Sequence, residues 1–337
     1  KNAFANVNID WLSKRKIAYT ISGNVIAAGV VAMLPRGFEL GVDFKGGYSY
    51  NVQFEESVDV DVEAFRSALT TSLEGSSLVV KEVDTDNNFY VVTDYLINDT
   101  DTTAADQVMA KLFAGANDVA GGTLTLDNFK NPDGKGTYVA SSSKVGPTIA
   151  DDIKKSAGMA AIFALLAIFI YIARRFGRGC GRQQVAYPLG AVAALFHDVL
   201  VVMGIFALLH GLLPFSMEID QAFIGAILTV IGYSINDTVV VFDRIREFMN
   251  QYTNRTKEEI VNMAVNSTIS RTVITSLTTL LVVAILFFFG GSSTKGLSLA
   301  LLIGILVGTY SSVFVATPIM SDVMGDLEPK EVKRKSF

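Results

Sequence analysis

The chain has 337 residues, of which 50% are hydrophobic and 18% are charged, and its formal net charge is −5 at pH 7. Several apolar runs reach the roughly 20 residues that a helix needs to cross a bilayer, so composition predicts an integral membrane protein and excludes an entirely soluble one. No motif of a nucleic-acid-binding domain occurs, and the single cysteine, Cys180, excludes a disulfide within the chain.

A basic triplet marks the start of the first predicted membrane helix. Residues 1–16 form a cytoplasmic N-terminal segment that ends in Lys14-Arg15-Lys16, and the apolar run Ile17–Leu34 follows. Because basic flanks stay in the cytoplasm, we expect this run to cross outward. It lacks the small-residue cleavage site of a usual signal peptide, so we interpret it as a retained anchor.

Residues 35–153 have the pattern of a soluble domain that follows the turn-rich link GVDFKGG. Alternating, β-branched and aromatic segments predict strands at 48–56, 78–84 and 87–96, with short extended segments at 123–129 and 137–141. Apolar residues at helical spacing predict helices at 62–73 and 103–113. The order β-α-β-β-α-β predicts an α+β domain of ferredoxin-like type, on the periplasmic side between the first two membrane helices.

Five further apolar runs predict membrane helices at 154–173, 185–209, 219–242, 264–289 and 296–320. The second span ends in an Arg-rich loop that contains Cys180. Residues 243–263 predict a cytoplasmic loop and helix, in which Thr256 and Glu259 form the helix cap. Residues 321–337 predict a cytoplasmic tail. The basic clusters all fall on one side. The sequence therefore predicts an all-α membrane bundle of six transmembrane helices with both termini in the cytoplasm.

The fourth span contains a carboxylate, Asp237, which is costly in hydrocarbon and therefore indicates a functional site. Asp237 precedes Asp243 by six residues, and Arg271 follows Ala264 by seven, so both lie roughly 10 Å from the cytoplasmic ends of their spans. We expect the two side chains to meet. Polar residues beside them are expected to support the site: Tyr233, Asn236 and Thr238 on one helix, and Ser267, Thr275 and Thr278 on the other.

Two interpretations of this Asp–Arg pair remain open on the residues alone. The pair is either a structural ion pair that fixes helix packing, or a carboxylate that gains and loses a proton under the influence of Arg271. His197 and Asp198 form a second polar site, for which a hydrogen-bonded packing role competes with proton transfer. Gly304 and Gly308 form a Gly-x-x-x-Gly pattern, which favours close helix packing.

The sequence contains no recognisable catalytic motif. It has two histidines and no His-Glu-x-x-His motif, which argues against a catalytic metal, and it has no phosphate-binding loop. Two intramembrane acids suggest an aspartyl protease, but the surrounding Ser-Ile-Asn-Asp differs from the Gly-x-Gly-Asp of that class. We therefore predict no catalytic residues and no metal.

A set of longer motifs occurs in order along the chain. These are GVDFKGG, KVGPTI, FHDV, GYSINDTVVVFDRIRE, SRTVITSLTTLL and LLIGILVGTYSSVFVATP. With them the chain resembles the SecF family of bacterial protein-export membrane subunits, or the SecF half of a fused SecDF. The resemblance covers the chain from the first span to the last. It implies an architecture of RND type (the resistance-nodulation-division superfamily), in which a SecD half would supply the pseudo-symmetric counterpart.

The resemblance also implies a function. A SecF-like subunit of the bacterial inner membrane would assist preprotein export with the transmembrane proton or sodium gradient, and Asp237 and Arg271 would belong to its ion-coupling site. No cofactor beyond H⁺ or Na⁺ is implied. The implied partners are a SecD-like half, the SecYEG translocon with YidC and YajC, the preprotein client and membrane lipid. The alternatives are an RND-class exporter of a small molecule or lipid, and a passive translocon scaffold whose Asp–Arg pair is structural.

Overall fold

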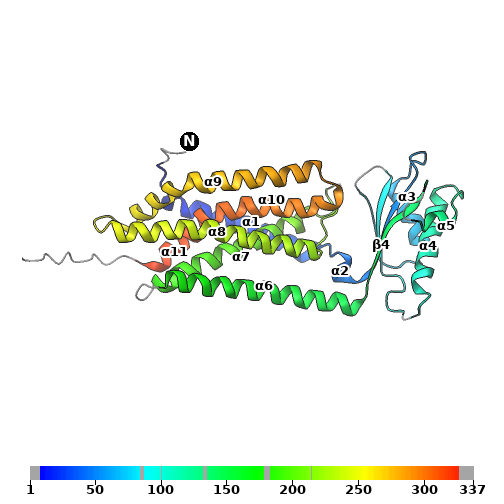
Figure 1. Ribbon diagram of the computed structural model, residues 1–337, viewed down its shortest axis with the longest axis horizontal. Helices are drawn as coiled ribbons and strands as arrows, with labels where there is room; N and C mark the ends of the chain where they lie inside the picture. The colour runs from blue at the N-terminus through cyan, green and yellow to red at the C-terminus, as the bar shows by residue number, and fades with distance from the viewer. Residues whose placement is uncertain are drawn as a thin grey trace, which may run out of the picture.

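The chain forms a bundle of long helices with a small sheet domain at one end (Figure 1). This computed structural model describes residues 8–83, 87–99, 101–131, 135–177, 183–213 and 215–325. Cys180 and most of the predicted C-terminal tail lie outside the described residues. The first helix begins, and the last described helix ends, at the end of the bundle that is remote from the sheet domain (Figure 1).

Six helical segments of the described chain are long and apolar enough to cross a membrane, which agrees with the predicted number. They are α1 (Arg15–Arg36, after the short turn η1, Leu12–Lys14), α6 (Pro147–Phe176), α7 (Gln183–Leu209), α8 (Gln221–Gln251), α9 (Lys257–Phe289) and the composite of α10 (Ser292–Ser311), η2 (Ser312–Ala316) and α11 (Thr317–Met324). The segment η2 is a π-helical turn, in which the Thr317 hydroxyl donates to the Ser312 carbonyl at 2.8 Å.

The predicted cytoplasmic helix is continuous with the fifth apolar run. Thr256 begins α9 with a complete capping box: its hydroxyl accepts from the Glu259 backbone N–H at 3.3 Å, and the Glu259 carboxylate accepts from the Thr256 N–H at 3.1 Å. The predicted cap is thus confirmed, while no break separates the polar turns from the apolar ones. α8 and α9 therefore extend together beyond the bundle at the end remote from the sheet (Figure 1).

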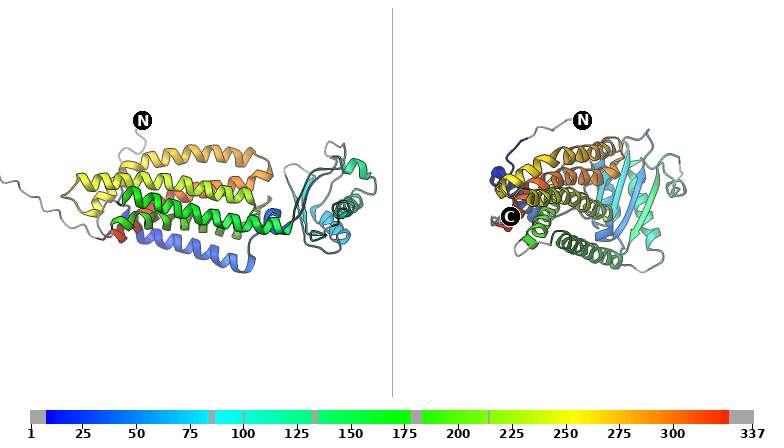
Figure 2. Two further views of the ribbon diagram at one scale, coloured as in Figure 1. Left: turned by 60° about the horizontal axis from the view of Figure 1, so that its bottom comes forward. Right: turned by 60° about the vertical axis from the view of Figure 1, so that its left-hand side comes forward.

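The helix α7 lies in the middle of the bundle and packs against α1, α6, α8, α10 and α11. Its contact with α1 is close, because a Cβ at Gly29 would lie 2.7 Å from the Cα of Gly204. α6 and α9 lie at the outside of the bundle, where only 6% and 11% of their apolar windows are buried (Figure 2). Much of the apolar surface of α6 and α9 is therefore left for lipid or for a partner protein.

The sheet domain has four strands in the order β2-β3-β1-β4, and each neighbouring pair is antiparallel. The strands are β1 (Gly47–Gln53), β2 (Leu78–Glu82), β3 (Asn88–Thr93) and β4 (Tyr138–Val145). Two helices, α3 (Val62–Ser72) and α4 (Ala104–Val119), cover one face. Phe54, Phe65 and Phe89 meet edge to face in that core. The chain order of these elements matches the predicted β-α-β-β-α-β order.

Two short segments differ from the sequence prediction. The segment 123–129, expected to be extended, contains the helical turn α5 (Leu126–Phe129), because that turn places Phe129 fully inside the core beside Phe113. The link GVDFKGG contains the short helix α2 (Val42–Lys45). It ends at Gly46, whose φ of +75° suits glycine.

An extended segment joins the sheet domain to the bundle. Leu40 and Ile219 form an isolated parallel bridge, in which the Gly41 N–H donates to the Ile219 carbonyl at 3.0 Å. Lys81 of β2 pairs with Glu39 and lies 3.9 Å from the Glu218 carboxylate. Burial of Glu218 raises its pKa to about 7, against the opposing effect of Lys81. This junction thus contains more carboxylates than cations.

Candidate functional site

Asp237 lies at the contact of three helices. Its side chain is 4% exposed on α8, and its Oδ2 atom accepts a long hydrogen bond of 3.5 Å from the Ser276 hydroxyl of α9. Ser276 in turn shares a hydrogen bond of 2.6 Å with the Thr309 hydroxyl of α10. The carboxylate therefore has a sparse set of polar neighbours in an apolar helix bundle.

The predicted contact between Asp237 and Arg271 is not formed in the described chain. Arg271 is exposed on the outside of α9, and no ion pair joins it to Asp237. The polar residues of α9 that face inward are Thr268, Thr272 and Ser276. Arg271 still lies near enough for its charge to act on the Asp237 carboxylate, although the two form no ion pair.

Two of the polar residues predicted to face Asp237 on α9 each precede a buried polar residue by one position. Ser267 precedes Thr268, and Thr275 precedes Ser276. Ser267 and Thr278 are exposed and Thr275 is half-buried. In the described chain the Ser267 and Thr278 hydroxyls donate to backbone carbonyls of α9 itself, and no hydrogen bond joins them to Asp237. The part that these residues and Arg271 take in ion coupling stays a prediction.

The three residues expected to support Asp237 on α8 have different environments. Thr238 is buried, and its hydroxyl bonds the Ser234 carbonyl at 3.2 Å and the Ser312 hydroxyl at 2.9 Å. Asn236 is exposed. Tyr233 is half-buried, and its hydroxyl has no hydrogen-bond partner in the described chain. Of the three, Thr238 alone ties α8 to η2.

His197 and Asp198 form the second polar site, in the centre of the bundle. Asp198 is 0% exposed; its Oδ2 accepts from the hydroxyls of Ser234 at 2.6 Å and Ser311 at 2.9 Å, and its Oδ1 lies 3.0 Å from His197 Nδ1. His197 Nε2 lies 3.0 Å from the Ser22 hydroxyl. This site therefore connects α1, α7, α8 and α10.

The two glycines of the Gly-x-x-x-Gly pattern face α8. A Cβ at Gly304 would overlap the Val230 side chain, and one at Gly308 would lie 2.9 Å from the Cβ of Ser234. The glycines therefore act as packing residues between α10 and α8 of the same chain. The close approach allows Thr309 and Ser311 to reach Ser276 and Asp198.

Sequence reasoning missed several hydroxyl residues of these two sites. They are Ser22, Ser234, Ser276, Thr309, Tyr310 and Ser311. Ser234 carries a usable signal, because it lies three residues before Asp237 and so shares its helix face. The others lie in apolar spans that are rich in serine and threonine, where spacing alone does not select them.

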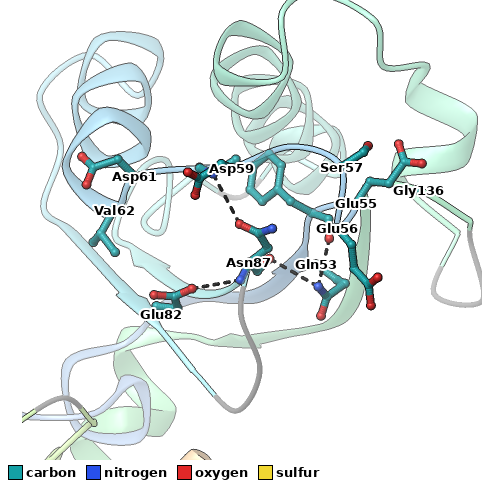
Figure 3. Close-up of a pocket in the computed structure, with 12 residues that line it drawn as sticks. Gln53, Glu55, Glu56, Ser57, Asp59, Asp61, Val62, Glu82, Asn87 and Gly136 are labelled. Carbon is teal, nitrogen blue, oxygen red and sulfur yellow. Dashed lines mark hydrogen bonds between the residues drawn. The ribbon is translucent and has the colours of Figure 1, made fainter.

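The sheet domain has an acidic hollow of about 1450 Å³ (Figure 3). Asn87 lies at its centre, where its side-chain oxygen accepts from the Val60 N–H at 3.3 Å and its own N–H donates to Glu82 at 2.9 Å. The carboxylates that line it are Glu55, Glu56, Asp59, Asp61 and Glu82. The described chain has no cluster of His, Cys, Asp and Glu suited to a metal ion.

Two family models match the chain. Residues 127–326 match the C-terminal region of the protein export membrane proteins SecD and SecF, and residues 31–58 match the GG motif of SecD and SecF. The second match contains the GVDFKGG link and the first strand. The first contains α6 to α11, and hence every residue of both polar sites except Ser22.

Relatives of known name cover nearly the whole chain. The protein translocase subunit SecF of Rhodothermus marinus is 43% identical over 95% of this chain and 94% of its own length. That of Haemophilus influenzae is 35% identical over 93% of this chain and 86% of its own length. Among solved structures, SecDF of Thermus thermophilus, described as a translocon-associated membrane protein, superposes with a TM-score of 0.74 at 30% identity. The superposition covers 93% of this chain but 38% of that longer chain.

Proposed function

The chain belongs to the SecF family of protein translocase subunits, and on that premise we propose that it uses a transmembrane proton or sodium gradient to assist preprotein export. It is membrane-embedded, and a subunit of this family is an accessory of the translocase rather than an enzyme. One elementary charge that crosses 100 mV releases about 2.3 kcal/mol. That energy biases a two-state motion roughly fiftyfold, at about 1.4 kcal/mol per factor of ten.

The observation that carries the proposal is the environment of Asp237. A carboxylate that is 4% exposed in an apolar helix is expensive unless it is neutralised. Its partner in the described chain is a hydroxyl at 3.5 Å, which is a weak one for a full negative charge. Binding a proton or a sodium ion removes this cost, so the site favours exchange of a cation with the gradient.

The exposure of Arg271 supports a partner protein at this face of α9. The residue is exposed in the middle of α9. The apolar side chains of Ile274 and Leu277, three and six residues after it, are 50% and 61% exposed. A guanidinium does not face hydrocarbon there without protein or water around it. We propose that a SecD-like half covers this face and brings Arg271 and Asp237 into one ion-coupling site. The SecYEG translocon, YidC, YajC and the preprotein would be further partners.

The proposed orientation puts the sheet domain in the periplasm and both termini in the cytoplasm of a bacterial inner membrane. The sheet order and helix placement suit the ferredoxin-like domain that the sequence predicted. Basic residues support this orientation because they gather at the bundle end remote from the sheet; they are Lys14, Arg15, Lys16, Arg174, Arg175, Arg244, Arg246 and Lys257.

Thiol labelling tests the orientation. Ser67 is exposed on α3, so Ser67→Cys should react in intact cells with a reagent that does not cross the inner membrane, whereas the natural Cys180 should react only after the membrane is opened. The opposite pattern would contradict the proposed orientation. It would leave the question of ion coupling untouched.

Export assays test the coupling. Asp237→Asn keeps the size of the side chain but cannot titrate, so gradient-dependent export should fall to background while the protein still inserts. Asp243→Asn is the matched control, because Asp243 lies on the same helix and pairs with Arg175 at 2.6 Å away from the site. Arg271→Lys keeps the charge and loses the planar fork, so export should fall there too.

The double variant Asp237→Asn/Arg271→Gln separates coupling from a passive scaffold. A scaffold with a structural pair loses function when one charge is left alone and regains it when both are removed. Ion coupling requires the carboxylate itself. Recovery of export in the double variant would therefore rule out the coupling proposal, and recovery of protein level alone would support it.

A further inference from the structure

We propose that His197 and Asp198 form a second proton-binding site, which is enclosed within this chain. We further propose that this site positions the turn of α8 that carries Asp237. The proton-binding part stands on the geometry of the pair. The consequence for Asp237 rests on the ion coupling proposed above. The two carboxylates would then be linked through α8 rather than through direct contact.

The enclosure of the pair is the first argument. Asp198 is 0% and His197 is 7% exposed, and the His197 ring is the cationic partner that Asp198 has among the described residues. An isolated charge at this position is costly, so the pair is most stable when its net charge is zero. A net charge of zero requires one proton more than an ionised aspartate and a neutral histidine carry together.

The hydrogen bonds around the pair define where that proton lies. The Tyr310 hydroxyl donates to the Ala18 carbonyl at 3.1 Å, so the Ser22 hydroxyl donates to the Tyr310 oxygen at 3.2 Å. The Ser22 oxygen must then accept from His197 Nε2 at 3.0 Å, which places a hydrogen on Nε2. The extra proton is shared between His197 Nδ1 and Asp198 Oδ1, which are 3.0 Å apart.

Loss of the proton changes the hydrogen bonds on both sides of the pair. With Nδ1–H still donating to Asp198, Nε2 becomes an acceptor, and the Ser22 hydroxyl turns from Tyr310 of α10 toward His197 of α7. Asp198 then carries its negative charge without the balancing proton. Its bonds from Ser234 and Ser311 are then fully charge-assisted and become stronger.

Ser234 transmits this change to Asp237. It lies three residues before Asp237 on the same face of α8, and its carbonyl accepts from the hydroxyls of Thr238 at 3.2 Å and Ser312 at 3.4 Å. A stronger bond to Asp198 pulls this turn of α8 toward α7 and α10. The proton on the His197–Asp198 pair therefore controls how firmly the turn that carries Asp237 is held.

Few other titratable groups face the pair. Tyr310 faces it from α10, while α1 and α8 present Ser22 and Ser234. Asp237 is the next charged group along α8. The remaining charged residues of the helices packed on α7 lie toward helix ends: Arg15, Lys16, Arg36, Asp151, Asp152, Lys154, Lys155, Arg174, Arg175, Asp243, Arg244, Arg246, Glu247, Lys295 and Asp322.

Nitrogen NMR of histidine tests the proton site directly. The chain has two histidines, so ¹⁵N-histidine labelling of the full chain in lipid gives two ring systems, and His210→Gln assigns them. As the pH is raised over the range in which the folded chain is stable, the two ring nitrogens of His197 should change from both protonated, or protonated at Nε2, to protonated at Nδ1 alone. Signals of His197 that stay constant throughout would overturn the proposal.

A second measurement tests the link to Asp237. Ser234→Ala removes the connecting hydroxyl, so His197 should still titrate while the pH profile of gradient-dependent export loses its dependence on that titration. Ser298→Ala is the matched control, because Ser298 is equally buried on α10 and bonds its own helix at Thr294. A Ser234→Ala profile identical to the control would contradict the positioning role.

The two proposals fail in different ways. If Asp237→Asn leaves export intact, the proposed function fails, but the His197 titration is still measured on the unaltered pair. If Asp237→Asn abolishes export and His197 does not titrate, the second proton site fails alone. Asp198→Asn should abolish the His197 transition, and a transition that persists unchanged in that variant would also contradict the proposal.

Discussion

The two carboxylates of the bundle differ in how completely this chain surrounds them. Asp198 has three side-chain partners from α7, α8 and α10, at 2.6 to 3.0 Å, and it lies within a network that reaches α1. Asp237 has one side-chain hydrogen bond in the described chain, at 3.5 Å, and it lies next to a helix that the rest of the bundle leaves mostly uncovered. Both acids are buried, but one site is complete within the chain and the other is not.

This difference separates two uses of a buried charge. A carboxylate that is fully hydrogen-bonded can hold helices together, and its removal leaves other groups without partners. A carboxylate with a weak, incomplete environment is poised to take up a cation or to meet a partner protein. Variants that affect the two acids differently are therefore the most informative ones.

The largest effect on stability is expected when each acid is replaced by leucine. Asp198→Leu strands the donors of Ser234, Ser311 and His197, which should cost about 3–5 kcal/mol of unfolding free energy. Asp237→Leu removes one long hydrogen bond and should change stability by about 1 kcal/mol or less. Unfolding of both variants in the same detergent and at one pH measures the contrast. Equal losses would mean that the two sites are equally structural.

Glu218 offers a third, largely buried carboxylate outside the apolar helices as a reference. Its side chain is 11% exposed and its pKa is about 7, raised from an ordinary value near 4.5. The folded chain thus binds this proton more tightly than the unfolded chain. The stabilisation is complete below about pH 4.5 and is lost as the pH rises through about 7. At about 1.4 kcal/mol per pKa unit it amounts to about 3.5 kcal/mol.

The variant Glu218→Gln should remove this pH dependence. Limited proteolysis at the junction between the sheet domain and the bundle, followed from about pH 5 to about pH 8, measures it. In the unaltered chain, cleavage should become faster as the pH rises. Glu56→Gln is the control, since Glu56 is exposed in the same domain. A pH profile that Glu218→Gln leaves unchanged would show that another group controls the junction.

A smaller effect is expected at the contact between α8 and α10. Gly304→Ala forces a methyl group into the Val230 side chain, which should cost about 1–3 kcal/mol and separate Ser311 from Asp198. Gly232→Ala on α8 is the control, because a Cβ there meets nothing within 4 Å. The control should be neutral or stabilising by up to about 1 kcal/mol. A neutral Gly304→Ala would mean that the Asp198 site tolerates a looser bundle.

The smallest effect is expected from Ser276→Ala. This change removes the 3.5 Å contact to Asp237 and the 2.6 Å contact to Thr309, and it should cost about 0.5–1.5 kcal/mol. Ser267→Ala, on the exposed face of the same helix, should be within about 0.5 kcal/mol of the unaltered chain. Thermal unfolding of the pair would sharpen the distinction between the inner and outer polar faces of α9.

The sequence was sufficient for the features that depend on local signals. The length of the apolar runs predicted six spanning helices, and the Thr256–Glu259 pair predicted where α9 begins. Alternating, β-branched and aromatic segments predicted β1, β2 and β3. A short extended segment predicted β4, which continues to Val145, four residues past the predicted end. The cost of an acid in hydrocarbon singled out Asp198 and Asp237 before any contact was known.

The orientation of α9 was not available from the sequence. In a soluble helix the polar side faces water, but in a membrane the outside is as apolar as the inside, so periodicity does not distinguish Arg271's face from Ser276's face. The contact between His197 and Ser22 joins residues 175 positions apart. Serine and threonine are frequent in these spans and bond their own helices as well, so no spacing rule identifies that pair.

The π-helical turn η2 keeps the helices on either side of it, α10 and α11, in register with the rest of the bundle. Each residue of an α-helix advances by about 100°, so one extra residue in a continuous α-helix would turn everything that follows by about that angle, whereas the wider π-helical turn takes that residue up locally. In this orientation α11 brings Met320 to α7, where a Cβ at Gly190 would lie 2.9 Å from the Met320 Cβ. Deletion of Val313 would therefore turn η2 into an ordinary α-helical turn and leave Met320 facing α7. A residue inserted in α10, where the helix has no such turn, would instead rotate Met320 off α7.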